Sequence, residues 1–187
     1  MGLIVLVSCR PRTDAPVPVV DLLHDLDRAE KQPREGFALS AHQRGGIVRP
    51  AAVVPVPSRL TIPLPLPRRG ALQAFVAIEA DDPAAVIRFR VGVSDHRIYE
   101  ALGDIVVSGD RRGWQELRTD LSAYAGFKWS LFYRPDWIVW RLVLATDLLG
   151  GRPARAVWGT PEIVTDRDAV KEYVARRERM RHLPSLR

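Results

Sequence analysis

The sequence predicts an all-β protein, an antiparallel β-sandwich with a short N-terminal helix and a C-terminal helix. Apolar and polar residues alternate over strand-length stretches between Ser58 and Val164. Turn-forming residues separate these stretches at intervals of roughly 8 to 12 residues. No helical pattern lies between them, which favours antiparallel sheets over a parallel sheet with crossover helices.

The bulk composition limits what the protein does. A chain of 187 residues with 47% hydrophobic content is long enough for one domain with appendages. Its net charge of +6 favours acidic partners such as phosphate, an anionic glycan or an anionic lipid. The sequence has no run of aromatic and basic residues typical of single-strand binding, so no nucleic-acid partner is expected. A single cysteine excludes a disulfide framework and a site built from several thiolates.

The chain starts with an apolar run that ends in Leu6-Val7-Ser8-Cys9. This tetrapeptide resembles the lipobox of bacterial lipoproteins, in which the cysteine is diacylated and becomes the new N-terminus. The resemblance implies lipidation of Cys9 and a membrane anchor in the cell envelope. The alternative is that Leu3 to Val7 form a buried first strand of a cytoplasmic protein, with an ordinary thiol. Arg10 to Pro18 is rich in proline and charge, which indicates an extended linker.

The next segments show a change of period. Apolar residues at positions 19, 22, 23 and 26 predict a short amphipathic helix over Val19–Glu30. Leu39 and Ile47 mark short strand fragments at an edge of the sandwich. Prolines recur from Pro50 to Pro67, which argues against a central strand there, because proline donates no hydrogen bond to a ladder. The alternation within Ser58–Leu66 therefore predicts an edge strand.

The remaining strands follow from the same two-residue period. They are predicted at Ala71–Ala80, Ala85–Ser94, Ile98–Ser108, Trp114–Leu121, Phe127–Tyr133, Trp137–Thr146 and Ala154–Val164. The stretch 137–145 is apolar on both faces except at Arg141, so it is expected to be the most buried strand. Thr165 to Asp168 is similar to a capping box and predicts the start of a C-terminal helix with a basic second half.

These segments divide the chain into four parts. They are a lipobox-like segment at 1–9, a linker and short helix at 10–35, the sandwich at 36–164 and the basic helix at 165–187.

Two phrases carry a family resemblance. One runs from Gly113 to Gly126 and contains Trp114, an Asp-Leu-Ser turn and Tyr-Ala-Gly; the other runs from Ala156 to Ile163 around Trp158. Both are similar to phrases of bacterial galactose-binding-like jelly-roll domains. The resemblance implies a jelly-roll sandwich that is not catalytic and that binds carbohydrate or packs beside an enzyme domain. It implies no particular sugar.

The candidate ligand site is a set of basic and aromatic residues that neighbouring strands bring to one face or rim. Guanidinium forks and an aromatic plane at one place suit sulfate, carboxylate or sugar hydroxyls. The alternative is a solvated sheet face whose arginines cover apolar neighbours with their stems. The candidate residues are Arg88, Arg90, Arg97, Tyr99, Arg134, Trp137 and Arg141.

Three further hypotheses stand behind this one. A structural or assembly protein would dock an unknown partner protein or anionic lipid through its basic C-terminal helix. A glycan-active enzyme would draw a carboxylate pair from the loop acids Asp95, Glu100, Asp104 and Asp110. No cofactor is expected; the alternative is a stabilising calcium ion at Asp81, Asp82 or Asp110.

Overall fold

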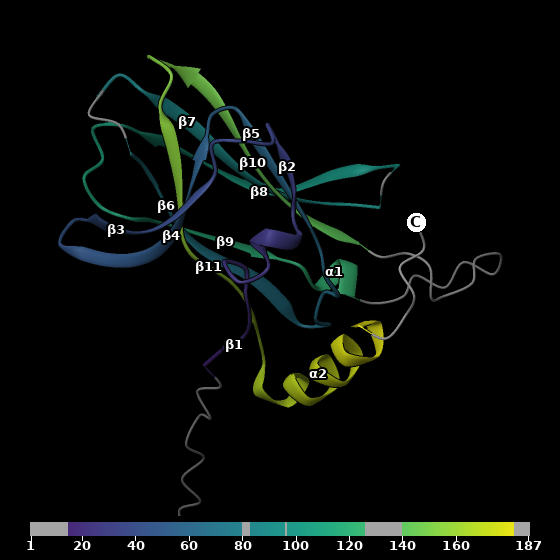
Figure 1. Ribbon diagram of the computed structural model, residues 1–187. Coiled ribbons are helices and arrows are strands. Elements are labelled where there is room, and N and C mark those ends of the chain that lie inside the picture. The colour runs from purple at the N-terminus through teal and green to yellow at the C-terminus, as the bar shows by residue number, and fades with distance from the viewer. Residues whose placement is uncertain (1–14, 80–82, 96, 126–139, 182–187) are drawn as a thin grey trace, which may run out of the picture.

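Two antiparallel sheets form a sandwich, as the ribbon diagram of the computed structural model shows (Figure 1). The structure describes residues 15–79, 83–95, 97–125 and 140–181. The first sheet contains β1 (Val17–Asp21), β3 (Ala38–Arg44), β4 (Ile47–Pro55), β6 (Gly70–Ile78), β9 (Gln115–Asp120) and β11 (Arg155–Thr165). The second sheet contains β2 (Glu30–Gln32), β5 (Ser58–Pro63), β7 (Val86–Ser94), β8 (Tyr99–Ser108) and β10 (Arg141–Gly150). The helices are η1 (Leu26–Arg28), α1 (Ser122–Ala125) and α2 (Arg167–Arg181).

The strand order is that of a jelly roll. The first sheet has the order β3-β4-β11-β6-β9, with β1 beside the later part of β11, and the second has the order β2-β5-β10-β7-β8. Four strands of each sheet, β4-β11-β6-β9 and β5-β10-β7-β8, are connected so that the chain passes repeatedly from one sheet to the other. This arrangement confirms the predicted fold class.

The core is built from the inward faces of both sheets. Ile87, Phe89 and Val91 of β7 are fully buried, as the alternation along that strand predicts. From the opposite sheet, Trp158 of β11 meets Phe89 edge to face, with ring centroids 5.2 Å apart and an interplanar angle of 78°. These two rings join the centres of the two sheets, and their burial dominates the local packing energy.

The predicted helix over Val19–Glu30 is wrong except for one 3-10 turn. Val17–Asp21 forms strand β1, and of the predicted helix only η1 is helical. Val20 and Leu22 are both buried, which is the two-residue period of a strand. Strand β4 pairs with β11 only up to Gly159, and β1 continues along that edge from Glu162 to Thr165. The backbone groups of β11 beyond Gly159 need a hydrogen-bonding partner on this edge. Pairing with them makes Val17–Asp21 a strand, although the spacing of the apolar residues favours a helix.

The exclusion of a central strand by the prolines was also wrong, because β4 contains Pro50 and lies between β3 and β11. The ladder with β11 covers only Ala51–Pro55, so Pro50 lies where β4 has a neighbour on one side. Proline is tolerated at such positions. Strand β5, predicted to be an edge strand, lies second from the edge, because the three residues of β2 pair with it.

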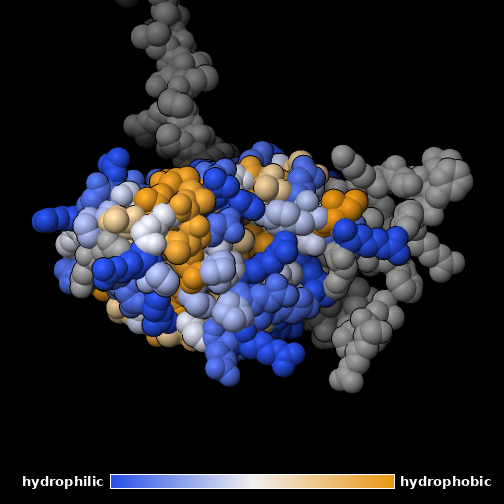
Figure 2. All heavy atoms as spheres, turned by 90° about the horizontal axis from the view of Figure 1, so that it is seen from above, coloured by the Kyte–Doolittle hydropathy of each residue, from blue (hydrophilic) through white to orange (hydrophobic). Residues whose placement is uncertain are grey.

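The predicted strand fragments around Leu39 and Ile47 are the two arms of one hairpin, β3–β4. Gly45 and Gly46 connect the arms with φ angles of +56° and +80°, which suit a two-residue turn. Leu39 and Ile47 are exposed at 59% and 53%. Figure 2 shows that apolar residues do reach the surface, in a patch bordered by hydrophilic residues.

Strand β10 is the central strand of the second sheet, between β5 and β7. Leu142, Val143 and Leu144 are at most 2% exposed, so the strand is buried on both faces there, as predicted. The predicted strand at Phe127–Tyr133 and the first residues of the one at 137–146 lie outside the described residues.

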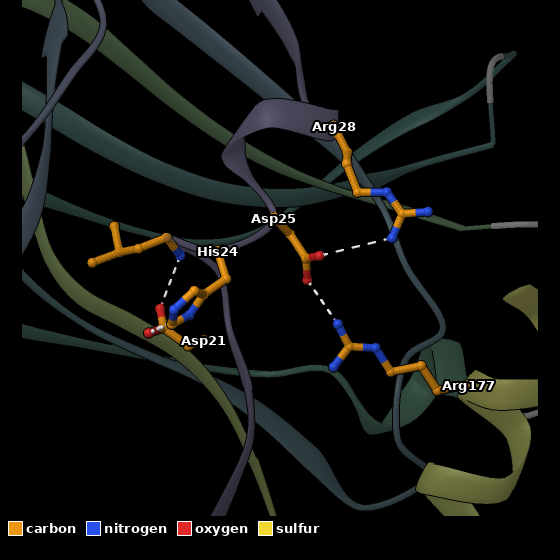
Figure 3. Close-up of polar contacts among 6 residues, drawn as sticks. Asp21, His24, Asp25, Arg28 and Arg177 are labelled. Carbon is orange, nitrogen blue, oxygen red and sulfur yellow. Dashed lines mark hydrogen bonds and ion pairs between the residues drawn. The ribbon is translucent and has the colours of Figure 1, made fainter.

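The C-terminal helix α2 is docked on the sandwich by its first half, where Ala169 and Tyr173 are buried. Further along, the guanidinium of Arg177 donates to Asp25, with 3.0 Å between Nη2 and Oδ2. Asp25 also lies 4.0 Å from Arg28, and its side chain is only 13% exposed (Figure 3). The helix is therefore tied to the segment that follows β1. Docking of a partner protein or lipid by this helix remains a prediction.

Near the Arg177–Asp25 ion pair, the carboxylate of Asp21 accepts hydrogen bonds from its own segment. Its Oδ1 accepts from the backbone N–H of Leu23 at 2.9 Å, and its Oδ2 lies 3.0 Å from Nδ1 of His24 (Figure 3). These contacts shape the turn that leads from β1 into η1. Within the described ranges, no helix has the length and apolar character needed to cross a membrane.

Replacing the central aromatic residue tests this account of the core. We expect Trp158→Ala to lower the free energy of unfolding by about 3–5 kcal/mol, because it leaves a cavity between the sheets. Urea denaturation followed by circular dichroism measures the loss. The control Leu39→Ala, at an exposed position, should change stability by less than about 0.5 kcal/mol. A loss at Trp158 as small as at Leu39 would show that the ring does not hold the sheets together.

Candidate functional site

The outer face of the second sheet carries polar side chains, because successive residues of a strand point to opposite faces and the apolar ones point into the core. On β7, Arg88, Arg90 and Gly92 alternate with core residues and therefore point outward. The pairing of the five strands brings one outward residue from each strand into a row. This row consists of Gln32, Arg59, Ala145, Arg90 and Asp104.

Four charged residues on this face form alternating ion pairs. In the strand register, Arg88 is opposite Asp147 and Arg90 is opposite Asp104. The shortest contacts run diagonally: Arg90 Nη2 lies 3.0 Å from Asp147 Oδ2, and Arg88 Nε lies 3.6 Å from Asp104 Oδ2. Each carboxylate thus lies between two guanidinium groups. The four side chains are 29–52% exposed, so each pair contributes little stability, about 0–1 kcal/mol.

Tyr99, at the start of β8, lies on the same face as these four charged residues, called the charged quartet below. Its ring packs on Gly92, where an added Cβ would lie 2.6 Å from Cε2 of the ring. The guanidinium carbon of Arg59 lies over the same ring, 4.6 Å from its centroid. Residues from β8, β7 and β5 are thereby stacked, with the ring between a bare stretch of backbone and a cation. The position of Arg59 is fixed by this stack.

A groove of about 520 Å³ opens beside the stack. Such a volume is within the range of small-molecule sites. Its polar lining comes from Gln32, Arg59, Arg90, Tyr99 and Asp147, while Pro33, Pro57 and Ala145 add apolar surface.

The groove also borders Ser58 and Thr146, two hydroxyl residues that are buried. Their oxygens are 2.8 Å apart and hydrogen-bonded to each other, and Thr146 also donates to the carbonyl of Pro55 at 3.4 Å. These hydroxyls are satisfied within the protein and join β5 to β10. The groups available to a ligand are therefore those of the polar lining.

The structure brings together some of the predicted site residues. Arg90 and Tyr99 line the groove, and Arg88 lies beside it on the same face. Arg141 is on this face too, but its Nη1 donates to Glu30 Oε1 at 2.5 Å, away from the groove lining.

Among the described site residues, Arg97 is not part of the groove lining. Arg97 belongs to the loop before β8, and its backbone N–H donates to Asp95 at 2.9 Å. Arg134 and Trp137 lie outside the described residues, as does the predicted lipidation site Cys9. A ligand role for Arg134 and Trp137 and the lipidation of Cys9 therefore stay predictions.

Three residues of the polar lining, Gln32, Arg59 and Asp147, were missed from the sequence. Arg59 was detectable, because it alternates with Leu60 and Ile62 and must face outward with Thr61. Asp147 follows directly after the predicted end of its strand. Gln32 gives no local signal, because it reaches the groove through a three-residue strand that pairs with β5.

Three of the loop acids considered for catalysis have structural contacts. Asp95 Oδ1 accepts from the backbone N–H groups of Ile98 and Arg97 at 2.8 and 2.9 Å. These hydrogen bonds hold the pKa of Asp95 below its usual value. Glu100 accepts a hydrogen bond from Tyr124, which raises the pKa of Tyr124 to about 12. Asp104 belongs to the charged quartet.

Possible metal ligands show no clustering in the part of the chain that the structure describes. Within it, no three His, Cys, Asp or Glu side chains gather closely enough to hold an ion. Asp110 is exposed there, whereas Asp81 and Asp82 lie outside the described residues. The calcium hypothesis therefore stays a prediction.

No protein-family model matches the chain, and no curated protein is similar to it in sequence. Solved structures share its fold at low identity. The N-terminal CBM22-1–CBM22-2 tandem domain of Paenibacillus barcinonensis Xyn10C has a TM-score of 0.50 and 12% identity, over 84% of this chain and 47% of that chain. The CBM22-1 xylan-binding domain of the same protein has a TM-score of 0.46 and 13% identity, over 74% and 85%.

A third structure contains the M60 catalytic domain and two CBM51 domains of Clostridium perfringens ZmpB. It has a TM-score of 0.46 and 14% identity, over 68% of this chain. The present chain spans 12% of that one. Of these three structures, the tandem domain alone reaches a TM-score of 0.50, and at 12% identity its likeness shows the fold and nothing more.

The contact between Tyr99 and Gly92 can be tested by adding one methyl group. We expect Gly92→Ala to lower the free energy of unfolding by about 1–3 kcal/mol, because the new Cβ would overlap the ring and the carbonyl oxygen of Glu100. The control is Gly113→Ala, whose Cβ would meet nothing within 4 Å and should change stability by less than about 1 kcal/mol. Thermal denaturation of both variants measures the difference. Equal stability of the two would mean that Tyr99 does not require this bare backbone.

Proposed function

We propose that the β-sandwich is a non-catalytic carbohydrate-binding module whose ligand lies in the groove on the outer face of the second sheet. The observation that carries the proposal is the composition of the groove lining. Hydrogen-bond donors, hydrogen-bond acceptors and apolar surface all line one groove.

The lining matches the chemistry of a sugar. A sugar hydroxyl both donates and accepts hydrogen bonds, so it needs donors and acceptors close together. Arg90 and Asp147 provide a donor and an acceptor side by side and hold each other in place at 3.0 Å. Gln32 adds a group that does both. Proline rings and Ala145 provide surface for the apolar parts of a sugar ring.

The fold gives a second, weaker line of support. A tandem of two CBM22 domains has the same sandwich, at a TM-score of 0.50. The sandwich architecture is thus compatible with a binding module, while the ligand of that tandem does not carry over at 12% identity. The proposal therefore depends on the residues of this groove.

Two arginines on β7 provide a matched test of the groove. Arg90→Gln and Arg88→Gln each break one exposed ion pair on the same strand, but only Arg90 lines the groove. For a glycan bound by the wild-type chain, we expect Arg90→Gln to weaken binding about tenfold or more, because a hydrogen bond from a charged donor is lost. Arg88→Gln should leave the affinity within about twofold. Isothermal titration calorimetry of the full chain with neutral and acidic glycans measures both.

Two outcomes contradict this proposal. The first is that no glycan of either class binds to the wild-type chain. The second is that the two variants lose affinity equally, which would place the sugar outside the groove.

We further propose that the module is held at the cell envelope by a lipid on Cys9. The support is the Leu6-Val7-Ser8-Cys9 sequence alone. In a bacterial host that processes lipoproteins, a palmitate analogue should label the wild-type chain, and the chain should sediment with membranes. Cys9→Ser should abolish both. Equal labelling of the Cys9→Ser variant, or none of the wild type, would exclude this anchor.

A further inference from the structure

We propose that the groove selects an anionic sugar, with Arg59 as the residue that recognises its carboxylate or sulfate group. This inference rests on the proposed carbohydrate-binding function and adds the ligand class. It follows from how the charges on this face are paired.

Arginines outnumber carboxylates on the described part of the outer face. Its carboxylates are Glu30, Asp104 and Asp147, and its arginines are Arg59, Arg88, Arg90 and Arg141. Three ion pairs use all three carboxylates: Arg88 with Asp104, Arg90 with Asp147, and Arg141 with Glu30. Arg59 is the arginine left without one among the residues described.

The strand register explains why Arg59 is left over. Its direct neighbours in the row are Gln32 and Ala145, which carry no charge. Its diagonal neighbours are the carboxylates Glu30 and Asp147, two residues away along β2 and β10. Arg141 holds Glu30 at 2.5 Å, and Arg90 holds Asp147 at 3.0 Å. Both nearby acids are therefore already paired with other cations.

The stack on Tyr99 leaves Arg59 ready to bind. The guanidinium carbon lies over the ring, 4.6 Å from its centroid, and no carboxylate on the described part of this face is paired with it. A guanidinium carries five N–H donors, so Arg59 has donors to offer an acceptor in the groove. Because Tyr99 itself rests on Gly92, the guanidinium is held in position before the ligand arrives. A held group loses less conformational entropy on binding.

The cost of removing water from the charged Arg59 side chain favours an anionic ligand. A neutral sugar that covers the groove would remove water from Arg59 without supplying a counter-charge, which is costly. A carboxylate or sulfate on the sugar would supply that charge and accept two parallel N–H···O bonds from the guanidinium edge. Uronate and sulfated sugars share this anionic oxygen chemistry.

Pairs of polymers that differ only in charge test this inference. Polygalacturonate is compared with its methyl ester, and dextran sulfate with dextran, in calorimetric titrations of the full chain. We expect the charged member of at least one pair to bind about 10- to 100-fold more tightly. A preference for polygalacturonate identifies a carboxylate, and a preference for dextran sulfate identifies a sulfate. The preference should decrease as salt is added.

Variants assign the preference to Arg59. Arg59→Gln should remove the preference for the charged polymer and lower the melting temperature only slightly, because Arg59 makes no ion pair among the described residues and loses only its cation–π contact with Tyr99. Arg59→Lys should keep part of it, since it retains the charge but loses the planar fork. The matched control is Arg88→Gln, which removes the same charge from the same face, lies outside the groove lining and frees no carboxylate next to Arg59; it should keep the preference.

The outcomes separate this inference from the proposed function. Equal binding of charged and neutral polymers, or binding of neutral ones only, overturns the anionic selectivity and leaves the carbohydrate-binding function intact. An equal loss in Arg59→Gln and Arg88→Gln overturns the role of Arg59, because it indicates attraction by overall charge. If no glycan binds at all, the proposed function itself fails.

Discussion

The contact between Trp158 and Phe89 is the interaction on which the rest of the molecule depends. It joins the central strand β11 of one sheet to β7 of the other, 5.2 Å between ring centroids. Because Phe89 must point into the core, its neighbours Arg88 and Arg90 must point outward. A slip of β7 by one residue would exchange the two faces, bury two guanidinium groups and expose the ring. The packing of Phe89 in the core therefore determines that Arg90 faces the groove.

The sequence predicted the parts of this arrangement that are local. Alternation along the strands located β6, β7, β8 and β11 within one or two residues and placed Arg88 and Arg90 on one outward face. It did not locate partners, because pairing between strands joins residues far apart in the chain. Gln32 comes from a segment predicted to be linker, and its place beside Arg59 depends on a three-residue ladder. Strand β1 was predicted to be helical, because the free edge of β11 has no signature near Val17 itself.

An arginine-rich face is a weak indication of function until its pairing is known. Three of the four arginines described on this face are matched by carboxylates of neighbouring strands, so their charges are largely cancelled where they lie. Such pairs add solubility and order to the sheet surface, and little stability. The distinguishing feature is the stacking of Arg59 on Tyr99, which no count of charged residues reveals. The overall charge of +6 says nothing about it.

The placement of β1 and α2 determines how the groove is presented. Val17 pairs with Thr165, and α2 begins two residues later, so the described chain enters and leaves near the same end of β11. Pro57 and Ser58 border the groove just after Pro55, which pairs with Arg155 at the other end of that strand. The two attachment points are therefore remote from the groove mouth. A tether that joins the sandwich through β1 would therefore be attached at the end of β11 opposite to the groove.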